Sequence, residues 1–327
     1  MKELFLTLQI RRCSWMTLCT LALLVLGPAL ARSQSWPTRT VTVVVGFEAG
    51  GVTDVLARLI SKNLSEEMGQ TFIVENKAGA GGILAATYVS HAAPDGYTLL
   101  FAAAPQMLAT PKLQSVKFDS FADFAPIAPV GSNSFVLAIK PSIPAKTIPE
   151  FVAYAKTHQI TYGSPGAGSI THLLSALFTS RAGFQATHVP FRGGGQALVA
   201  LLAGQIDMYF SPVGNVLPYA NTAQITLLGA ATQHRLAQLP DVPTIGEFYP
   251  NTVLPGWNGF MAPAKTPKVI IDKLAQSLTA MAGKPEHAAA IAKLGVEPLS
   301  QSTAEFSAQL KTDSSQFDEA IKAAGLK

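Results

Sequence analysis

The sequence is poor in cysteine. Its two cysteines, Cys13 and Cys19, both lie near its start, inside a segment that reads as an export signal. The chain that follows the signal therefore has no disulfide, no thiol nucleophile and no cysteine metal site. Neither cysteine follows the apolar core of the signal, where a cysteine for a lipid anchor would stand.

Charged residues are also scarce, at 13% of 327 residues, and no basic run extends beyond Arg11-Arg12. Charge spread in this way gives no footprint for nucleic-acid binding. The carboxylates are sparse and form no evident acid/base pair. The six histidines are scattered, and no pair has ligand spacing with a nearby carboxylate, so we expect no metal and no cofactor.

Three stretches of the sequence resemble enzyme motifs, but each lacks a residue that its motif requires. Leu84 stands where a dinucleotide fingerprint needs its third glycine. The stretch 163–169 has the glycines of a phosphate loop but no lysine before its hydroxyl residue. A nucleophile elbow around Ser164 would need glycine where Tyr162 stands. No base partner is evident for Ser164, so we expect binding without catalysis.

The first 31 residues have the pattern of a secretory signal. Charged residues precede the short apolar run 18–26, and Ala29-Leu30-Ala31 is a small-residue cleavage site. The apolar run is too short for a permanent membrane anchor. We expect export, with cleavage after Ala31, and the style of the signal is typical of a bacterial periplasmic protein.

The apolar run 41–45 predicts a buried strand, and a helical pattern begins near Thr53. Gly50 and Gly51 lie in the turn between them, where they allow close approach of the backbone to a ligand. Such a turn directs free N–H groups and the positive end of a helix dipole at one point, which favours anions. An ordinary strand–helix turn without a ligand remains the alternative.

The same alternation continues along the chain and favours an α/β fold with parallel sheets. Two further Gly-rich turns stand at 75–82 and 163–169. Strands are expected at 72–74, 97–101, 124–130, 135–139, 160–162, 187–189, 207–210 and 225–228. Helices are expected at 83–90, 147–156, 170–181, 193–204, 267–281 and from 302 onward.

The order of these elements predicts two lobes. The turn-rich segments around 239–244 and 255–257 would return the chain to the first lobe, with Trp257 in the core. The last helices, with no strand between them, are expected to pack on the outside of that lobe. Crossings near 131 and 256 then divide the chain into 32–130 plus 257–327 and 131–256. A ligand would lie between the lobes, where two crossings form a hinge.

Several motifs together resemble the Bug-type (TctC-like) solute-binding proteins of tripartite tricarboxylate transporters. They are the stretches 47–54, 74–82, 93–100, 123–127, 162–169 with His172, 188–193 and 239–244. The resemblance implies a periplasmic flytrap with two crossovers that binds a small organic carboxylate largely through backbone N–H groups. It also implies delivery to a permease with a large and a small multispanning subunit. A sensor for a membrane signalling partner and a serine-type hydrolase remain alternatives, and a monomer is expected.

The resemblance also implies the binding residues. The first clamp is Phe47, Ala49, Gly50, Gly51, Thr53 and Asp54, and the second is Ser164, Gly166, Ala167, Gly168 and Ser169. Further candidates are Glu48, Ala80, Gln106, His172, Arg192 and Asp207.

Several of these residues have two interpretations. His172 either orients its loop or is a structural histidine, and Arg192 either reaches a carboxylate or is a surface residue. Asp207 either caps the chain or accepts from a ligand. Gly46 stands where the family has proline, which suggests a looser turn. Glu48 faces solvent or selects a ligand with an amine or amide.

Overall fold

The computed structural model describes residues 36–191 and 193–327. Everything below concerns the compact unit Arg39–Lys327. The predicted signal, its cleavage site and Arg192 lie outside the described residues. Within the described part of the chain, no helix combines the length and the apolar character needed to cross a bilayer.

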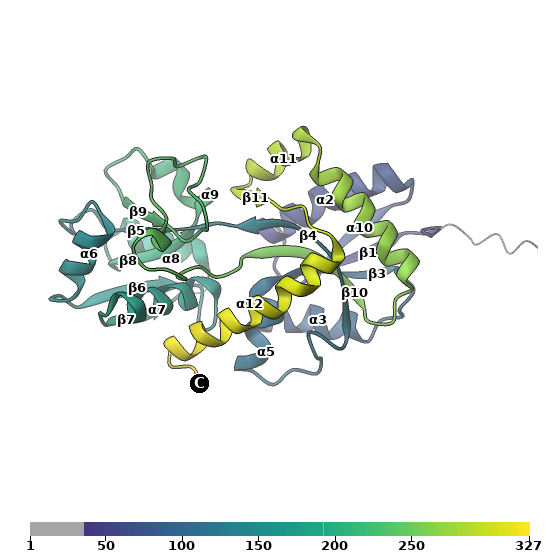
Figure 1. The fold of residues 1–327 in the computed structure, drawn as a ribbon, viewed down its shortest axis with the longest axis horizontal. Coiled ribbons are helices and arrows are strands. Elements are labelled where there is room, and N and C mark those ends of the chain that lie inside the picture. Colours follow the sequence, from purple (N-terminus) through teal and green to yellow (C-terminus); the bar gives the residue numbers. More distant parts are fainter. Residues whose placement is uncertain (1–35, 192) are drawn as a thin grey trace, which may run out of the picture. The chain divides into compact units, whose positions relative to one another are not determined.

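The first lobe is built on a six-stranded sheet in the order β11-β4-β10-β3-β1-β2 (Figure 1). Its strands are β1 (Val41–Val45), β2 (Phe72–Asn76), β3 (Thr98–Ala103), β4 (Phe124–Asn133), β10 (Trp257–Pro263) and β11 (Val296–Pro298). β1 is parallel to β2 and β3, whereas β10 runs antiparallel to β3 and β4. The expectation of a parallel sheet is therefore wrong for β10, and also for β11.

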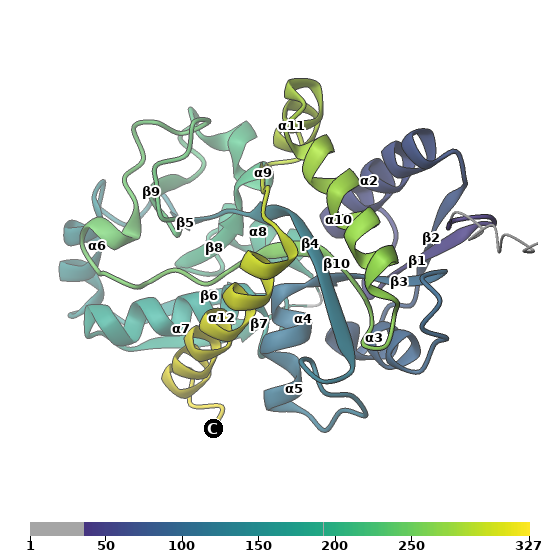
Figure 2. The same cartoon turned by 45° about the vertical axis from the view of Figure 1, so that its right-hand side comes forward.

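Helices cover both faces of this sheet. α2 (Val52–Met68), α10 (Lys268–Ala282) and α11 (Pro285–Ala292) lie on one side of it in Figure 1. α3 (Ile83–Ser90) and α5 (Thr110–Leu113) lie on the other side, and α4 (Ala104–Leu108) lies next to α5 in Figure 2. Because β1 is covered on both faces, Val41, Val43, Val44 and Val45 are all fully buried, and the strand is a continuous apolar run.

The second lobe has a five-stranded sheet in the order β7-β6-β8-β5-β9. Its strands are β5 (Phe135–Ile139), β6 (Ile160–Ser164), β7 (Ala186–Pro190), β8 (Met208–Pro212) and β9 (Thr226–Ala230). β6 is parallel to β7 and β8, and β5 is antiparallel to β8 and β9. Its longer helices are α6 (Ile148–Ala155), α7 (Ile170–Ala182) and α8 (Gly194–Leu202).

The side chains of β5 alternate between two apolar clusters. Val136 and Ala138 belong to the cluster that contains α8, and Leu137 and Ile139 to the cluster that contains α7. This period of two places α7 and α8 on opposite faces of the sheet. The α/β, two-lobed fold expected from the sequence is confirmed.

The chain passes between the lobes at two neighbouring places. It leaves the first sheet at Asn133 and enters the second at Phe135, and it returns through the segment between β9 and β10. The two crossings lie side by side, because the Asn133 N–H donates to the Gly256 carbonyl at 3.0 Å. The sequence indicated only a turn at 255–257, but the chain continues from there into the central strand β10.

The helix α12 (Thr303–Ala323) joins the lobes at a further place. Phe306, Leu310 and Phe317 share one apolar cluster with α7 and with β3 and α4 of the first lobe. α12 runs beside α7 in both views (Figures 1 and 2) and lies close to α4 in Figure 2. The expectation that the last helices only cover the first lobe is therefore wrong for α12, and β11 separates it from α11.

Asp313 on α12 is buried beneath the crossings. Its side chain accepts a hydrogen bond from the Trp257 indole N–H at 2.9 Å and one from the Gln309 amide at 3.2 Å. Burial raises the pKa of Asp313 to about 6, although both hydrogen bonds act in the opposite direction. Trp257 is 1% exposed, which confirms its predicted place in the core.

We expect Asp313→Asn to stabilise the protein at neutral pH. The folded state holds the Asp313 proton more tightly than the unfolded chain, whose pKa is 3.8. The stability that this bound proton contributes is therefore lost as the pH rises from 3.8 through about 6. Asparagine keeps an acceptor for Trp257, so urea unfolding near pH 7.5 should show a gain on the order of 2 kcal/mol. An equal gain below pH 4 would contradict the assignment to ionisation.

Candidate functional site

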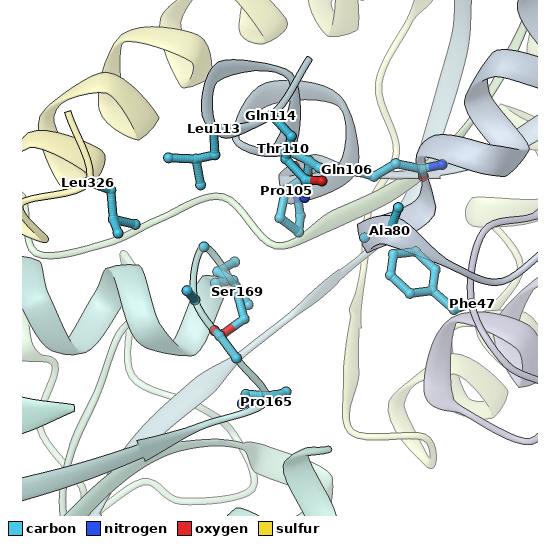
Figure 3. Close-up of a pocket in the computed structure, with 15 residues that line it drawn as sticks. Phe47, Ala80, Pro105, Gln106, Thr110, Leu113, Gln114, Pro165, Ser169 and Leu326 are labelled. Carbon is cyan, nitrogen blue, oxygen red and sulfur yellow. The ribbon is translucent and has the colours of Figure 1, made fainter. Parts of the chain in front are cut away.

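A cavity of about 650 Å³ lies between the first lobe and the start of α7 (Figure 3). Its volume is in the range of small-molecule sites. It is lined by Phe47, Ala80, Gly81, Pro105, Gln106, Thr110, Leu113, Gln114, Pro165, Gly166, Ala167, Gly168, Ser169, Ile170 and Leu326. These residues follow the carboxyl ends of β1, β2, β3 and β6, except for Leu326, which follows α12. None of the described lining residues is charged.

The loop from β6 to α7 forms one wall of the cavity. Gly166 and Gly168 have φ angles of +126° and +78°, which residues other than glycine adopt at a cost. The Gly166 carbonyl accepts hydrogen bonds from the Ser164 hydroxyl at 2.9 Å and from the Ser169 hydroxyl at 2.7 Å. The loop is thus folded tightly on itself before α7 begins.

The start of α7 presents unpaired donors to the cavity. Ser169 caps the helix, and its side chain accepts from the His172 N–H. The N–H groups of Ala167 and Ile170, two lining residues, have no hydrogen-bond partner among the described residues. The first turn of α7 has no acidic residue, so its dipole and these N–H groups favour an anion here.

Two histidines support this loop from behind. His172 is 4% exposed and stacks on His188, with ring centroids 3.9 Å apart. The Gly168 N–H donates to His172 Nδ1 at 3.0 Å, which requires Nδ1 to be unprotonated. Burial, assisted by His188, lowers the pKa of His172 to about 4. His172 therefore orients the loop as a neutral ring and does not line the cavity.

A base does stand beside Ser164, contrary to the sequence analysis. His188 Nε2 lies 2.6 Å from Ser164 Oγ. However, Ser164 is fully buried, and its Oγ also accepts from the Gly166 N–H at 3.0 Å. No carboxylate orients His188 among the described residues. A triad needs an accessible nucleophile and an oriented base, so this pair holds the loop in place.

The turn from β1 to α2 differs from the loop before α7. Asp54, in the first turn of α2, is 1% exposed and accepts from the Gly50 N–H at 2.9 Å. Burial by itself raises the pKa of Asp54, but hydrogen bonds from Arg58, Gly50 and Asn76 bring it below its usual value. This helix start therefore already holds a carboxylate of its own chain.

The other candidates in this turn lie outside the cavity lining. Ala49, Gly50 and Gly51 are exposed, and Thr53 is half-buried. Glu48 is also exposed, in agreement with the interpretation that it faces solvent. Only Phe47 of the first clamp lines the cavity.

Asp207 is placed far from the loop before α7. Its carboxylate pairs with Lys140 at 2.6 Å and accepts from the Thr161 hydroxyl at 2.8 Å. Thr161 stands near the amino end of β6, whereas Ser164 stands at its carboxyl end. Asp207 thus joins neighbouring strands at the end of the sheet opposite to the loop before α7.

The cavity wall formed by the first lobe depends on close packing of the backbone at Gly46 and Gly82 around the side chain of Gln106. Gln106 is fully buried, and its side chain accepts from the Ala103 N–H and donates to the Gly82 carbonyl. A Cβ on Gly46 would lie 2.8 Å from the Gly82 Cα and 2.9 Å from Gln106 Nε2. Gly46 therefore allows the first turn to pack closely against Gly82 and Gln106, and whether it also loosens the turn stays a prediction. Ala80, two residues before Gly82, has a φ of +50°.

The structure brings together seven of the predicted candidates in the cavity lining. They are Phe47, Ala80, Gln106, Gly166, Ala167, Gly168 and Ser169. The sequence analysis missed Gly81, Pro105, Thr110, Leu113, Gln114, Pro165, Ile170 and Leu326. Pro105 to Gln114 follow the carboxyl end of a predicted strand, which is a usable signal. Nothing in the sequence indicates Leu326.

We expect Gly46→Ala to destabilise the protein by about 1–3 kcal/mol, the usual cost of overpacking. The new methyl group would collide with Gly82 and Gln106. Gly246→Ala is the matched control, because its Cβ would meet nothing closer than the Thr244 hydroxyl oxygen at 3.7 Å. Urea unfolding measures both variants, and equal stabilities would contradict the crowding argument.

Acid should destabilise the protein through His172. The unfolded chain takes up this proton near pH 6.5, whereas the folded protein does so only at about 4. Stability is therefore complete above pH 6.5 and falls as the pH drops toward 4. His172→Gln should remove on the order of 3 kcal/mol of this loss.

The measurement is urea unfolding from pH 4 to 8, with the Asp313→Asn background used to remove the opposing titration. His91→Gln is the control, since His91 is exposed. If both histidine variants keep the acid slope of their parent, His172 is not its source.

Comparison with known proteins gives a consistent picture. The family model described as the tripartite tricarboxylate transporter family receptor matches residues 56–326. A solved structure described as periplasmic binding protein BugD has a TM-score of 0.76 and 30% identity. The match covers 89% of this chain and 99% of that one.

Two structures from Rhodopseudomonas palustris are also similar and carry ligands. Rpa4515 with adipate has a TM-score of 0.79 and 31% identity, and the match covers 89% of this chain and 98% of that one. MatC (Rpa3494) with bound malate has a TM-score of 0.75 and 31% identity, over 88% of this chain and all of that one. With the family model matching most of its length, the chain belongs to the receptor family of the tripartite tricarboxylate transporters.

Proposed function

We propose that the protein is a periplasmic receptor that captures a small organic carboxylate at the start of α7 and delivers it to a membrane permease. The observation that carries this proposal is the pair of unpartnered N–H groups of Ala167 and Ile170 at the cavity. Two N–H donors at a helix start bind a carboxylate without an arginine.

The family supports the class of function. Its members are receptors of a transporter and not enzymes, and two similar structures contain dicarboxylates. A permease with a large and a small multispanning subunit, a monomeric state and export with cleavage after Ala31 are part of the proposal. The lobe division at 131 and 256 is also a proposal, supported by the change of sheet after Asn133.

The mechanism follows from the position of the cavity. Its lining comes from both lobes, so a ligand held at α7 contacts the first lobe only when the lobes are together. A ligand that binds this state better than a separated state shifts the population toward it. Exclusion of water then strengthens each N–H to carboxylate bond.

The first test is a thermal-shift titration of the exported protein with acetate, butyrate, hexanoate, benzoate, succinate, malate and adipate. A ligand that binds only the folded state raises the unfolding midpoint with concentration. The amides of the same acids are the controls, because they lack the anion. A rise with acids but not with amides is expected, and no rise with any acid would contradict the receptor proposal.

Gly168 provides a sharper test of the site. A Cβ at Gly168 would lie 2.5 Å from Leu113 Cδ1 of the first lobe, so the Leu113 side chain, which also lines the cavity, would have to change its rotamer or the lobes would have to separate. We expect Gly168→Ala to weaken carboxylate binding by about tenfold or more, a change of about 1.4 kcal/mol. Isothermal titration calorimetry measures this loss.

Gly183→Ala is the matched control for Gly168→Ala. Gly183 ends α7 with φ +70°, close to the +78° of Gly168, but a Cβ there would meet nothing within 4 Å. Its variant should lose about 1–2 kcal/mol of stability and keep its affinity. Equal losses of affinity in both variants would show that backbone strain, not the contact between the lobes, is responsible.

A further inference from the structure

We propose that the cavity selects carboxylates with one charged end and an apolar body, and that Leu326 is a residue that determines this specificity. The inference rests on the proposed carboxylate receptor and names the chemical class of its ligand. Straight-chain and aromatic monocarboxylates fit this class, whereas hydroxy acids and short dicarboxylates do not.

Apart from Gln114, which is exposed, the polar side chains of the lining are already engaged. Both ends of the Gln106 amide are bonded to backbone groups. The Thr110 hydroxyl donates to the Pro105 carbonyl at 3.1 Å, and the Ser169 hydroxyl donates to the Gly166 carbonyl at 2.7 Å. Hydroxyl groups on a ligand would therefore find few partners here, and an unpaired buried hydroxyl weakens binding.

A second carboxylate would also find no cation among the described lining residues. Lys112, next to Leu113, is directed elsewhere, because its Nζ lies 2.7 Å from both Asp318 Oδ2 and the Ser314 carbonyl. Burying a charge without a partner is costly. The unpaired N–H groups of Ala167 and Ile170 can serve only one carboxylate at one end of the ligand.

The rest of the lining is apolar. In Figure 3, Leu113 and Leu326 lie close together on one side of the cavity, and Phe47 lies on the other side, with Pro105 between them. Pro165 closes the cavity from the second lobe. An aliphatic chain or an aromatic ring can bury its surface against these side chains, which favours binding in proportion to the apolar area.

Leu326 is held in this position by the end of α12. Gly325 has φ +64° and donates to the Lys322 carbonyl at 3.0 Å, and the Leu326 N–H donates to the Ile321 carbonyl at 3.2 Å. This pattern is a Schellman motif, which fixes the direction of the chain after a helix. The Leu326 side chain is therefore placed by the backbone, and it also packs against the apolar cluster that contains α12.

The first experiment compares acids of equal length by isothermal titration calorimetry on the exported protein. Hexanoate and adipate have the same number of carbons and differ by one carboxylate, and butyrate and malate differ by a carboxylate and a hydroxyl. We expect the monocarboxylate to bind at least about tenfold more tightly in each pair. Tighter binding of adipate or malate would overturn this inference and leave the receptor proposal intact, whereas no binding of any acid would overturn both.

The second experiment changes Leu326 itself. Leu326→Ala should weaken hexanoate binding by about fivefold to tenfold and leave acetate, which is too short to reach it, unchanged. Leu326→Lys should reverse the preference in favour of adipate by supplying a cation. Val269→Ala and Val269→Lys are matched controls, because Val269 is 74% exposed on α10. Thermal midpoints without ligand identify any variant that has lost its fold.

A third experiment tests whether Arg192, which lies outside the described residues, supplies a cation to the ligand. Arg192→Ala should leave the order of hexanoate over adipate unchanged. If wild type binds adipate more tightly than hexanoate and Arg192→Ala reverses this order, Arg192 supplies the missing cation and the inference is wrong. An unchanged Leu326→Lys preference would overturn the role of Leu326 in the same way.

Discussion

The apolar face of α12 is the interaction on which the arrangement of the lobes depends. Phe306, Leu310 and Phe317 join the core of the first lobe to α7 in the second, so that one continuous apolar cluster extends through both. An ion pair between Arg181 and Glu319 links α7 to the same helix. Any rotation of the second lobe about the two crossings must therefore move α7 against α12. The helix that sets this interface also delivers Leu326 to the cavity.

The two helix starts near the cleft look alike in sequence, but their electrostatic states differ. The start of α2 is complemented by Asp54, a buried carboxylate of its own chain. The start of α7 is capped by the neutral Ser169 and supported by the neutral His172. A helix dipole that has no carboxylate nearby attracts one from a ligand. This difference, more than the glycine content of either turn, supports the anion site that we propose at the start of α7.

Close contacts at glycines shape the walls of the cavity. Gly46, Gly82 and Gln106 are packed so closely that none of the glycines can carry a side chain. On the other lobe, a Cβ at Gly168 would lie 2.5 Å from the end of the Leu113 side chain. Glycine at these positions therefore serves close approach of backbone to neighbouring groups, and the positive φ of Gly168 adds a second requirement.

The sequence by itself determined the α/β class, the strand–turn–helix units and the two lobes. Local signals were sufficient because the apolar run 41–45, the capping residues Thr147 and Ser302 and the Gly-rich turns act within a few residues. It also indicated the loop before α7, because strand, glycine turn and helix follow one another in the chain. The motifs it shares with the receptor family strengthened both conclusions.

Only the tertiary structure decided the remaining features. β10 is a central strand because β3 and β4 supply partners on both of its sides, although its own sequence contains asparagine, glycine and proline. Asp54 turns inward because Arg58 and Asn76 meet it there. Leu326 reaches the cavity because α12 packs across both lobes. These contacts join residues that are distant in sequence, and no local pattern encodes which of them will meet.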